Sequence, residues 1–136
     1  VRRFGGIAGV HSCSDLDWSI LFGANLDIIS FDTYQFAKSF ALYAASIQEF
    51  MKNGGVVAWG VVPTDGRALA EENIESLSKQ IRKYIKHLTN KAIEPQLIYT
   101  QSIITPACGA GTLTTEEAKS IYQLTVELAR NWRSCF

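Results

Sequence analysis

The sequence has few cysteines, no excess of charge of either sign and no long hydrophobic run, and each absence excludes a class of protein. Three cysteines in 136 residues are too few, and odd in number, for the disulfide framework of a small secreted domain. The 13 basic side chains are balanced by 13 acidic ones, so the composition gives no electrostatic reason to expect nucleic acid or an anionic membrane as a partner. No apolar run approaches the ~20 residues that span a bilayer. We therefore expect a soluble protein of a reducing compartment, the cytoplasm.

The amino-terminal residues also lack the features of a secretory signal. The opening VRRFGGIAGVHS has two arginines but no apolar stretch followed by a small-residue cleavage site, and it has no initiator Met. A chain that opens directly on a strand-like run is expected to be a piece of something longer. Its 47% hydrophobic content is that of a single globular domain with a packed core.

Apolar runs of strand length alternate four times with amphipathic stretches of helix length. This alternation is typical of parallel strands joined by crossover helices, so the predicted fold class is α/β. The expected strands cover residues 5–12, 26–31 and 56–62 and a run within 96–105. The expected helices cover 15–23, 36–52 and 71–90 and a stretch that opens at Thr114.

Two of these helices have candidate amino-terminal caps. Asp15 precedes the short first helix, and its carboxylate is the expected cap. Thr114 and Glu117 have the spacing of a capping box at the start of the last helix. Trp59, inside the third strand, is expected to fill the core rather than to line a ligand site.

Side chains that bind metals follow three of the four expected strands. His11 and Cys13 lie two residues apart at the end of the first strand, so their side chains should project from the same face. Asp32 follows the second strand, and Cys108 follows the fourth. The carboxyl ends of parallel strands carry the functional side chains in α/β sheets and barrels. Two thiolates, one imidazole and one carboxylate would suit zinc, provided that these strands are neighbours.

Each of these residues also has an ordinary structural interpretation. A free cysteine often behaves as a small buried hydrophobe. Asp32 precedes a helical run and could be a helix cap, and Cys108 could be a turn residue before Gly109. The site is favoured because the ligand types coincide at the strand ends. His87 is expected on a solvated helix face, and Cys135 is expected to be a bystander.

A phosphate-binding loop is a poorer interpretation of the turn before the last helix. Gly109-Ala110-Gly111 precedes a capped helix, and helix N-termini can bind anions. The sequence has no G-x-G-x-x-G and no G-x-x-x-x-G-K-[ST], and no lysine lies just ahead of this helix. We therefore do not expect a nucleotide site.

Four segments carry a family resemblance: VHSC, GANLDIISFD, VVAWGVVPT and ITPACGAGTLTTEEA. Over nearly its whole length the chain resembles the carboxyl-terminal half of the catalytic barrel of cobalamin-independent methionine synthase. That family belongs to a larger group with uroporphyrinogen decarboxylase and the methylcobamide:coenzyme M methyltransferases. The resemblance implies a (βα)4 half of a TIM (β/α)8 barrel over residues 1–136, with parallel strands and the helices outside.

The same resemblance implies a zinc site and a reaction. It makes His11, Cys13 and Cys108 zinc ligands, and Asp32 falls where methionine synthases carry a zinc-binding glutamate. Asp32 is one methylene shorter than glutamate, so this position departs from the family pattern. The implied reaction moves a methyl group from methyltetrahydrofolate or a methylcorrinoid to the zinc-activated thiol of homocysteine, forming methionine. The alternatives are a coenzyme M-type thiol methyltransferase, a zinc-binding module without catalysis, and a metal-free relative such as a decarboxylase.

The number of strand and helix units predicts a missing partner. A closed barrel of eight units takes ~250 residues, whereas this chain has 136 residues and four units. We expect either a fragment of a longer synthase or a half-barrel that associates with a copy of itself or with a separate amino-terminal half. The fragment alone is expected to be inactive. An open sheet should expose the inward faces of five apolar residues, namely Val56, Val57, Val61, Ile103 and Ile104.

Overall fold

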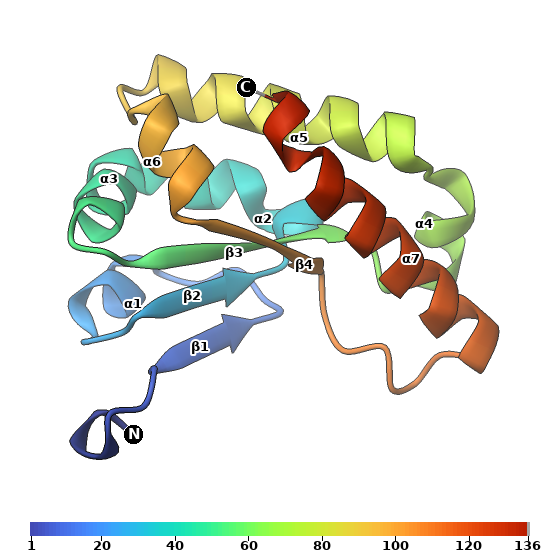
Figure 1. Cartoon of the computed structure of the whole chain (residues 1–136), viewed down its shortest axis with the longest axis horizontal. Helices are drawn as coiled ribbons and strands as arrows, with labels where there is room; N and C mark the ends of the chain where they lie inside the picture. The colour runs from blue at the N-terminus through green and yellow to red at the C-terminus, as the bar shows by residue number, and fades with distance from the viewer. Residues whose placement is uncertain (136) are drawn as a thin grey trace.

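A parallel sheet of four strands forms the centre of the molecule (Figure 1). The computed structural model describes residues 1–135, apart from the side chains of Arg2, Arg133 and Cys135. The strands are β1 (Gly9–Ser12), β2 (Ile28–Phe31), β3 (Val56–Val62) and β4 (Ser102–Pro106). They pair in the order β1-β2-β3-β4, and every pair is parallel. The predicted α/β class with a parallel sheet is confirmed.

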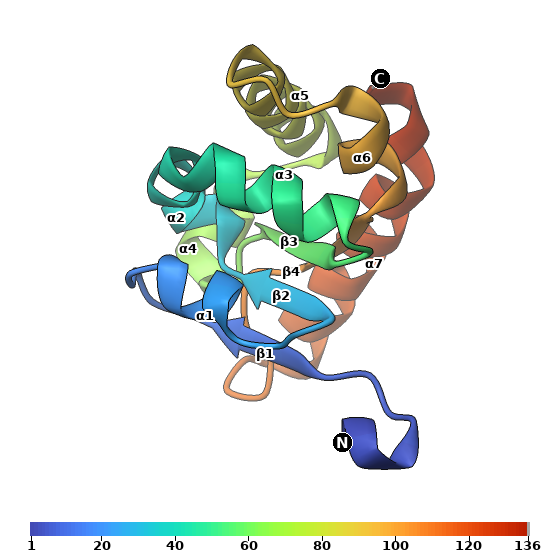
Figure 2. The same ribbon diagram turned by 90° about the vertical axis from the view of Figure 1, so that its left-hand side faces the viewer.

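The helices lie around this sheet. The α-helices are α1 (Ser19–Gly23), α2 (Thr33–Phe40), α3 (Ala44–Lys52), α4 (Gly66–Glu71), α5 (Ile74–Asn90), α6 (Pro95–Thr100) and α7 (Thr115–Asn131). Short 3-10 turns cover η1 (Arg2–Phe4), η2 (Ala41–Tyr43) and η3 (Trp132–Cys135). Figures 1 and 2 show α3, α5 and α7 following one another around one face of the sheet. This arrangement is compatible with half of a barrel. None of the helices in residues 1–135 is long and apolar enough to cross a bilayer.

The core lies between the sheet and the helices. Phe31 of β2 stacks on Phe40 of α2 with ring centroids 4.2 Å apart, and Trp18 meets both rings edge to face. Trp59 of β3 packs against the same rings, and its indole Nε1 donates a 2.8 Å hydrogen bond to Ser102 Oγ. The prediction that Trp59 fills the core is confirmed.

The expectation about the apolar inward face is wrong for three of its five residues. Val57, Val61 and Ile104 are only 0%, 3% and 7% exposed, because they share the face that packs on the helices. Register explains the difference: Trp59 pairs with Ile104, whereas Ala58 pairs with Ile103 on the opposite face. Ile103 is 45% exposed there, as expected.

The strand boundaries differ from the prediction at both edges of the sheet. β1 begins at Gly9 rather than at residue 5. β4 lies within the predicted run 96–105 apart from Pro106, and the residues before it form helix α6, which was not predicted, with Pro95 in its first turn. Proline fits the first turn of a helix because its missing N–H would have no partner there. Residues 56–62 form β3 as predicted.

Three predicted helices also have different boundaries. The helix expected over 36–52 begins at Thr33 and is interrupted by η2. The helix expected over 71–90 is α5, which begins three residues later, at Ile74, because Glu72 and Asn73 are extended, and the short helix α4 before it was not predicted. Asp15 does not cap α1, whose N-cap residue is Trp18 without a side-chain cap. The capping box of Thr114 and Glu117 is confirmed, with Glu117 N donating to Thr114 Oγ1.

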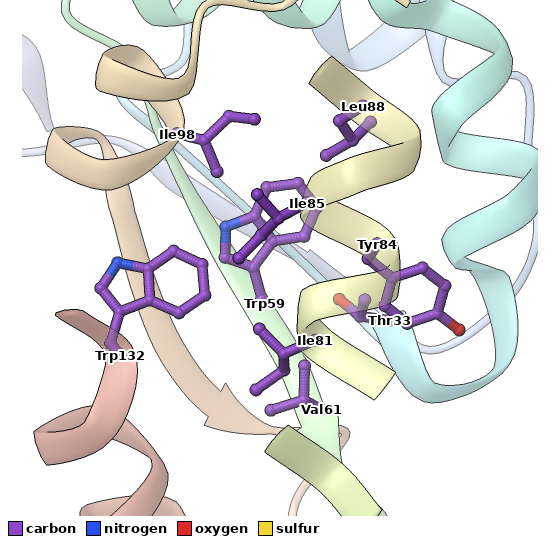
Figure 3. A pocket seen from close by; sticks show the side chains of 9 residues that line it. All are labelled: Thr33, Trp59, Val61, Ile81, Tyr84, Ile85, Leu88, Ile98 and Trp132. Atoms are coloured by element: carbon purple, nitrogen blue, oxygen red, sulfur yellow. The ribbon is translucent and has the colours of Figure 1, made fainter. Parts of the chain in front are cut away.

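A small cavity lies between β3 and α5 (Figure 3). Its volume is about 10 Å³, which is room for at most one water molecule. Thr33 Oγ1 is buried at its wall and has no hydrogen-bond partner within the described residues. The cavity is lined by Thr33, Trp59, Val61, Ile81, Tyr84, Ile85, Leu88, Ile98 and Trp132. It is a packing gap in an apolar core and too small for a substrate.

Gly60 holds the ends of β2 and β4 close together. A Cβ placed on Gly60 would lie 2.4 Å from the Phe31 carbonyl oxygen and 2.8 Å from Ala107 Cα. Both neighbours are backbone atoms and cannot rotate away. Gly60 therefore permits the close approach of the segments that lead to Asp32 and to Cys108.

We expect the substitution Gly60→Ala to lower the free energy of unfolding by ~1 to 3 kcal/mol, the usual cost of overpacking. Urea denaturation followed by circular dichroism measures the change. Gly111→Ala is the matched control, because a Cβ there would meet nothing within 4 Å. Equal unfolding midpoints for the two variants would contradict this account.

Candidate metal centre

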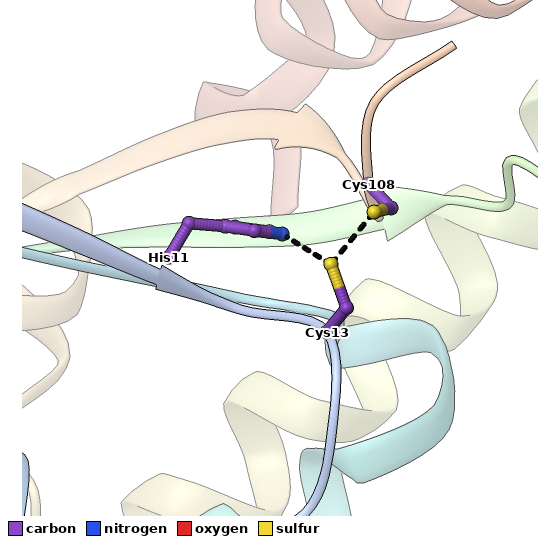
Figure 4. Close-up of side chains that lie close together, drawn as sticks. All are labelled: His11, Cys13 and Cys108. Carbon is purple, nitrogen blue, oxygen red and sulfur yellow. Dashed lines mark hydrogen bonds between the residues drawn. The ribbon is translucent and has the colours of Figure 1, made fainter. Parts of the chain in front are cut away.

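Three metal-binding side chains meet beyond the carboxyl ends of β1 and β4 (Figure 4). His11 lies in β1, Cys13 follows that strand directly, and Cys108 follows β4. His11 Nε2 is 3.1 Å from Cys13 Sγ, which is 2.6 Å from Cys108 Sγ. The three ligand atoms lie within 4.8 Å of one another. The group could hold a metal ion, and the sequence predicted all three of its members.

The chain that follows β4 brings Cys108 to Cys13. β1 and β4 are the two outer strands, with β2 and β3 between them. In a flat sheet, three spacings of ~4.8 Å would separate outer strands by about 14 Å. The two sulfur atoms nevertheless touch. The segment that follows β4 folds over the face that bears His11, because Ala107 Cα lies 2.8 Å from a Cβ placed on Gly60 of β3. This face is therefore concave, and the helices α3, α5 and α7 lie on the other side (Figure 2).

Ser30 orients the imidazole ring. It pairs with His11 across β1 and β2, so both side chains project from the same face. Ser30 Oγ lies 2.8 Å from His11 Nδ1, which leaves Nε2 directed at Cys13. A second hydrogen bond of this kind fixes the ring and tautomer of metal-binding histidines. Sequence reasoning missed Ser30, because its role depends on the strand register.

We expect Ser30→Ala to weaken metal binding by ~10-fold, the lower end of the usual effect of losing such a partner. The variant frees the ring to rotate but removes no ligand. Competition with a chromophoric chelator measures the affinity. Ser46→Ala on α3, outside the group, is a control that should leave affinity unchanged. The orienting role would be refuted by wild-type affinity in Ser30→Ala.

The contact between the thiols favours the protonated state of Cys13. The hydrogen bond with Cys108 is the main cause that raises the pKa of Cys13 to about 11, followed by partial burial and the nearby charges of Cys108 and Asp32. A metal ion binds thiolates and would have to displace these protons. The Cys13 thiol is therefore neutral at neutral pH in the absence of a metal ion.

Asp32 lies beside this group without belonging to it. Its side chain is 4% exposed and caps α2. Oδ1 accepts from Gln35 N at 2.9 Å, and Oδ2 accepts from Gln35 Nε2 at 2.7 Å. The interpretation of Asp32 as a helix cap is confirmed. Its assignment as a metal ligand stays a prediction and would require the hydrogen bond to Gln35 Nε2 to break.

A cleft of about 600 Å³ opens beside the two sulfur atoms. Carboxylates line it at Asp32 and Asp65, and none of the described side chains that line it is a lysine or an arginine. Asp65 Oδ1 caps α4 by accepting from Arg67 N and Ala68 N. The lining is Cys13, Asp32, Tyr34, Gln35, Pro63, Thr64, Asp65, Ala68, Ala107 and Cys108. A ligand in this cleft would meet both thiols in an acidic surrounding.

The remaining candidates lie away from this centre. His87 is exposed on α5, as expected, in a second cleft that is also lined by Lys38, Lys83, Lys86 and Lys91. Lysines therefore gather along this one cleft, although the net charge of the chain is zero. The side chain of Cys135 lies outside the described residues.

The helix after the glycine turn has the N-cap Thr114 and two acidic residues in its first turn. Glu117 Oε2 accepts from Thr114 N at 2.9 Å, and Glu116 also lies in the first turn of α7. Two carboxylates at a helix N-terminus oppose a phosphate group there. The local charge therefore gives no support to a phosphate site at this turn, and the absence of a nucleotide site stays a prediction.

Comparison with models of protein families, with curated proteins and with solved structures found no match for this chain. The resemblance to methionine synthase therefore stays a prediction that rests on the quoted segments.

Proposed function

We propose that the chain is half of a zinc-dependent methyltransferase, which moves a methyl group from methyltetrahydrofolate or a methylcorrinoid to the thiol of homocysteine and forms methionine. The observation that carries this proposal is a group of three ligands beside an open cleft, at His11, Cys13 and Cys108. Structural zinc sites use four protein ligands, whereas catalytic sites use three and leave one position for substrate.

The donor set fits zinc in its chemistry. One imidazole nitrogen and two thiolates are ordinary zinc ligands. In a tetrahedral site with Zn–S bonds of ~2.3 Å, two sulfur atoms lie about 3.8 Å apart. Cys13 and Cys108 would have to separate by about 1 Å from their present contact, which side-chain rotation can supply.

Each residue of the site would have its own role in the reaction. Bound zinc supplies positive charge that favours the thiolate form of a substrate thiol. Ser30 holds His11 in place. Asp32 is the proposed fourth ligand, which the substrate thiol would displace, because its carboxylate already accepts a hydrogen bond from Gln35. Asp32 and Asp65 make the cleft favourable for a cationic group, such as the ammonium of homocysteine. The same carboxylates oppose an anionic thiol such as coenzyme M, which favours the first acceptor over the second.

Cobalt substitution tests the open position. Cobalt(II) bound to the chain should show visible absorption bands that change when homocysteine is added, because the thiol becomes a fourth ligand. Methionine, which has no ionisable thiol, is the matched control and should leave the spectrum unchanged. No response to homocysteine would identify a closed, structural site. Failure to bind cobalt or zinc would favour a metal-free relative, and a stronger response to coenzyme M would reverse the choice of acceptor.

A further inference from the structure

The two thiols of the site can also react with each other. We propose that Cys13 and Cys108 form a site of reversible oxidation, at which a low-molecular-weight disulfide converts the metal-free pair into one intramolecular disulfide. This inference goes beyond the proposed methyl transfer and does not depend on it.

The geometry of the pair favours this bond. The sulfur atoms are 2.6 Å apart and point toward each other (Figure 4). A disulfide needs ~2.05 Å, so small side-chain rotations suffice. Cys13 is exposed and Cys108 is partly exposed, and both line the cleft of about 600 Å³. A small disulfide can therefore reach the pair from solvent.

His11 can accept the proton that the first step releases. In the tautomer whose Nδ1 donates to Ser30 Oγ, His11 Nε2 is a free acceptor 3.1 Å from Cys13 Sγ. Cys13 passes its proton to His11, and its sulfur attacks one sulfur of the reagent RSSR. The reagent S–S bond breaks, and RS⁻ leaves and takes up a proton as RSH. Cys13 then carries a mixed disulfide, Cys13–S–S–R.

Cys108 resolves this intermediate. Its thiol loses a proton to solvent, and its sulfur attacks the sulfur of Cys13 in contact with it. The Cys13–SR bond breaks, and the second RS⁻ leaves and is protonated. The sum is two protein thiols and RSSR giving one protein disulfide and two RSH. The two protein sulfurs are oxidised, and the two reagent sulfurs are reduced.

The product would change both the fold and the site. The bond joins residues 95 positions apart, at the ends of the two outer strands, and long closed loops stabilise the folded state most. It also removes two of the three candidate metal ligands. Oxidised chain should therefore resist urea better than reduced chain and bind no metal.

Oxidised glutathione is the probe for this reaction. The chain is freed of metal with a chelator, treated with oxidised glutathione, alkylated and digested. Mass spectrometry should find a peptide pair joined through Cys13 and Cys108, which dithiothreitol separates again. Cys135→Ser is the matched control and should leave the cross-link in place. Cys108→Ser should stop the reaction at a glutathione adduct on Cys13.

Two results would overturn the inference: a stable glutathione adduct on Cys13 in the unaltered chain, or cross-links that require Cys135. Zinc added before the oxidant should protect the pair. If the cross-link forms equally well with zinc present, the proposed metal site fails while the oxidation site stands. If zinc protects and no cross-link forms without zinc, the oxidation site fails while the metal site stands.

Discussion

Replacing Cys13 or Cys108 with alanine is expected to weaken zinc binding by at least ~100-fold. Loss of a residue that only hydrogen-bonds to a metal ligand usually costs about 10- to 100-fold, and loss of the ligand itself should cost more. Each change deletes one of the three ligand atoms that lie within 4.8 Å of one another. A thiolate contributes charge as well as a bond, so neither water nor the remaining side chains can replace it. Competition with a chromophoric chelator at fixed pH measures the loss.

Asp32 provides the contrasting substitutions. Asp32→Ala should retain substantial zinc binding, because both carboxylate oxygens already serve Gln35. It should instead lower the free energy of unfolding by ~1 kcal/mol through loss of the helix cap. Asp32→Asn keeps a side-chain oxygen that can cap α2 but removes the negative charge. It therefore separates the role of Asp32 as a helix cap from its role as a metal ligand. If Asp32→Asn loses as much zinc affinity as the cysteine variants do, Asp32 is a metal ligand of the same weight as the two cysteines.

The predictable parts of the fold are those that local sequence determines. β3 is a continuous apolar run that ends before Pro63, and its bounds are as predicted. The capping box of Thr114 and Glu117 likewise depends on residues three positions apart. Patterns of this kind need no knowledge of the tertiary structure.

The errors in the fold arise where tertiary contacts choose between two local structures. The sequence predicts no helix over residues 95–100, yet they form α6, which buries Ile98. The alternation of side chains does not show whether the odd- or the even-numbered residues of β3 face the helices. The prediction that Val57 and Val61 are exposed on the open face is therefore wrong. The pairing of Trp59 with Ile104 places both side chains on the face that packs against the helices. The sequence of a single strand does not show how it pairs with its neighbour.

The candidate site divides in the same way. His11, Cys13 and Cys108 were predictable because parallel strands bring their carboxyl ends to one edge. From the sequence, Asp32 could be either a helix cap or a metal ligand. Its hydrogen bonds to Gln35 show that it is a helix cap in this structure. Ser30 has no local signal, since its contact with His11 crosses from one strand to the next.

The open sheet leads to the second prediction of large effect, that the isolated chain binds zinc but transfers no methyl group. β1 and β4 each pair on one side only within the described residues, and the concave face leaves Ile103 45% exposed. Unpaired strand edges and exposed apolar side chains favour association. We propose that a second half-barrel, either a separate amino-terminal half or another copy, covers this face. That half would supply most of the methyl donor's pocket and the contacts to the amino-acid end of homocysteine that Asp32 and Asp65 do not make.

Sedimentation and activity measurements test this prediction together. At high micromolar concentration the chain should sediment as more than a monomer, and Ile103→Lys should reduce that association by placing charge on the concave face. Leu42→Lys is the matched control, because Leu42 is 74% exposed on the helical side and should not affect association. Methyl transfer to homocysteine should appear only when the missing half is supplied. A stable monomer that transfers methyl groups unaided would refute the half-barrel, because a four-stranded sheet would then hold a complete active site.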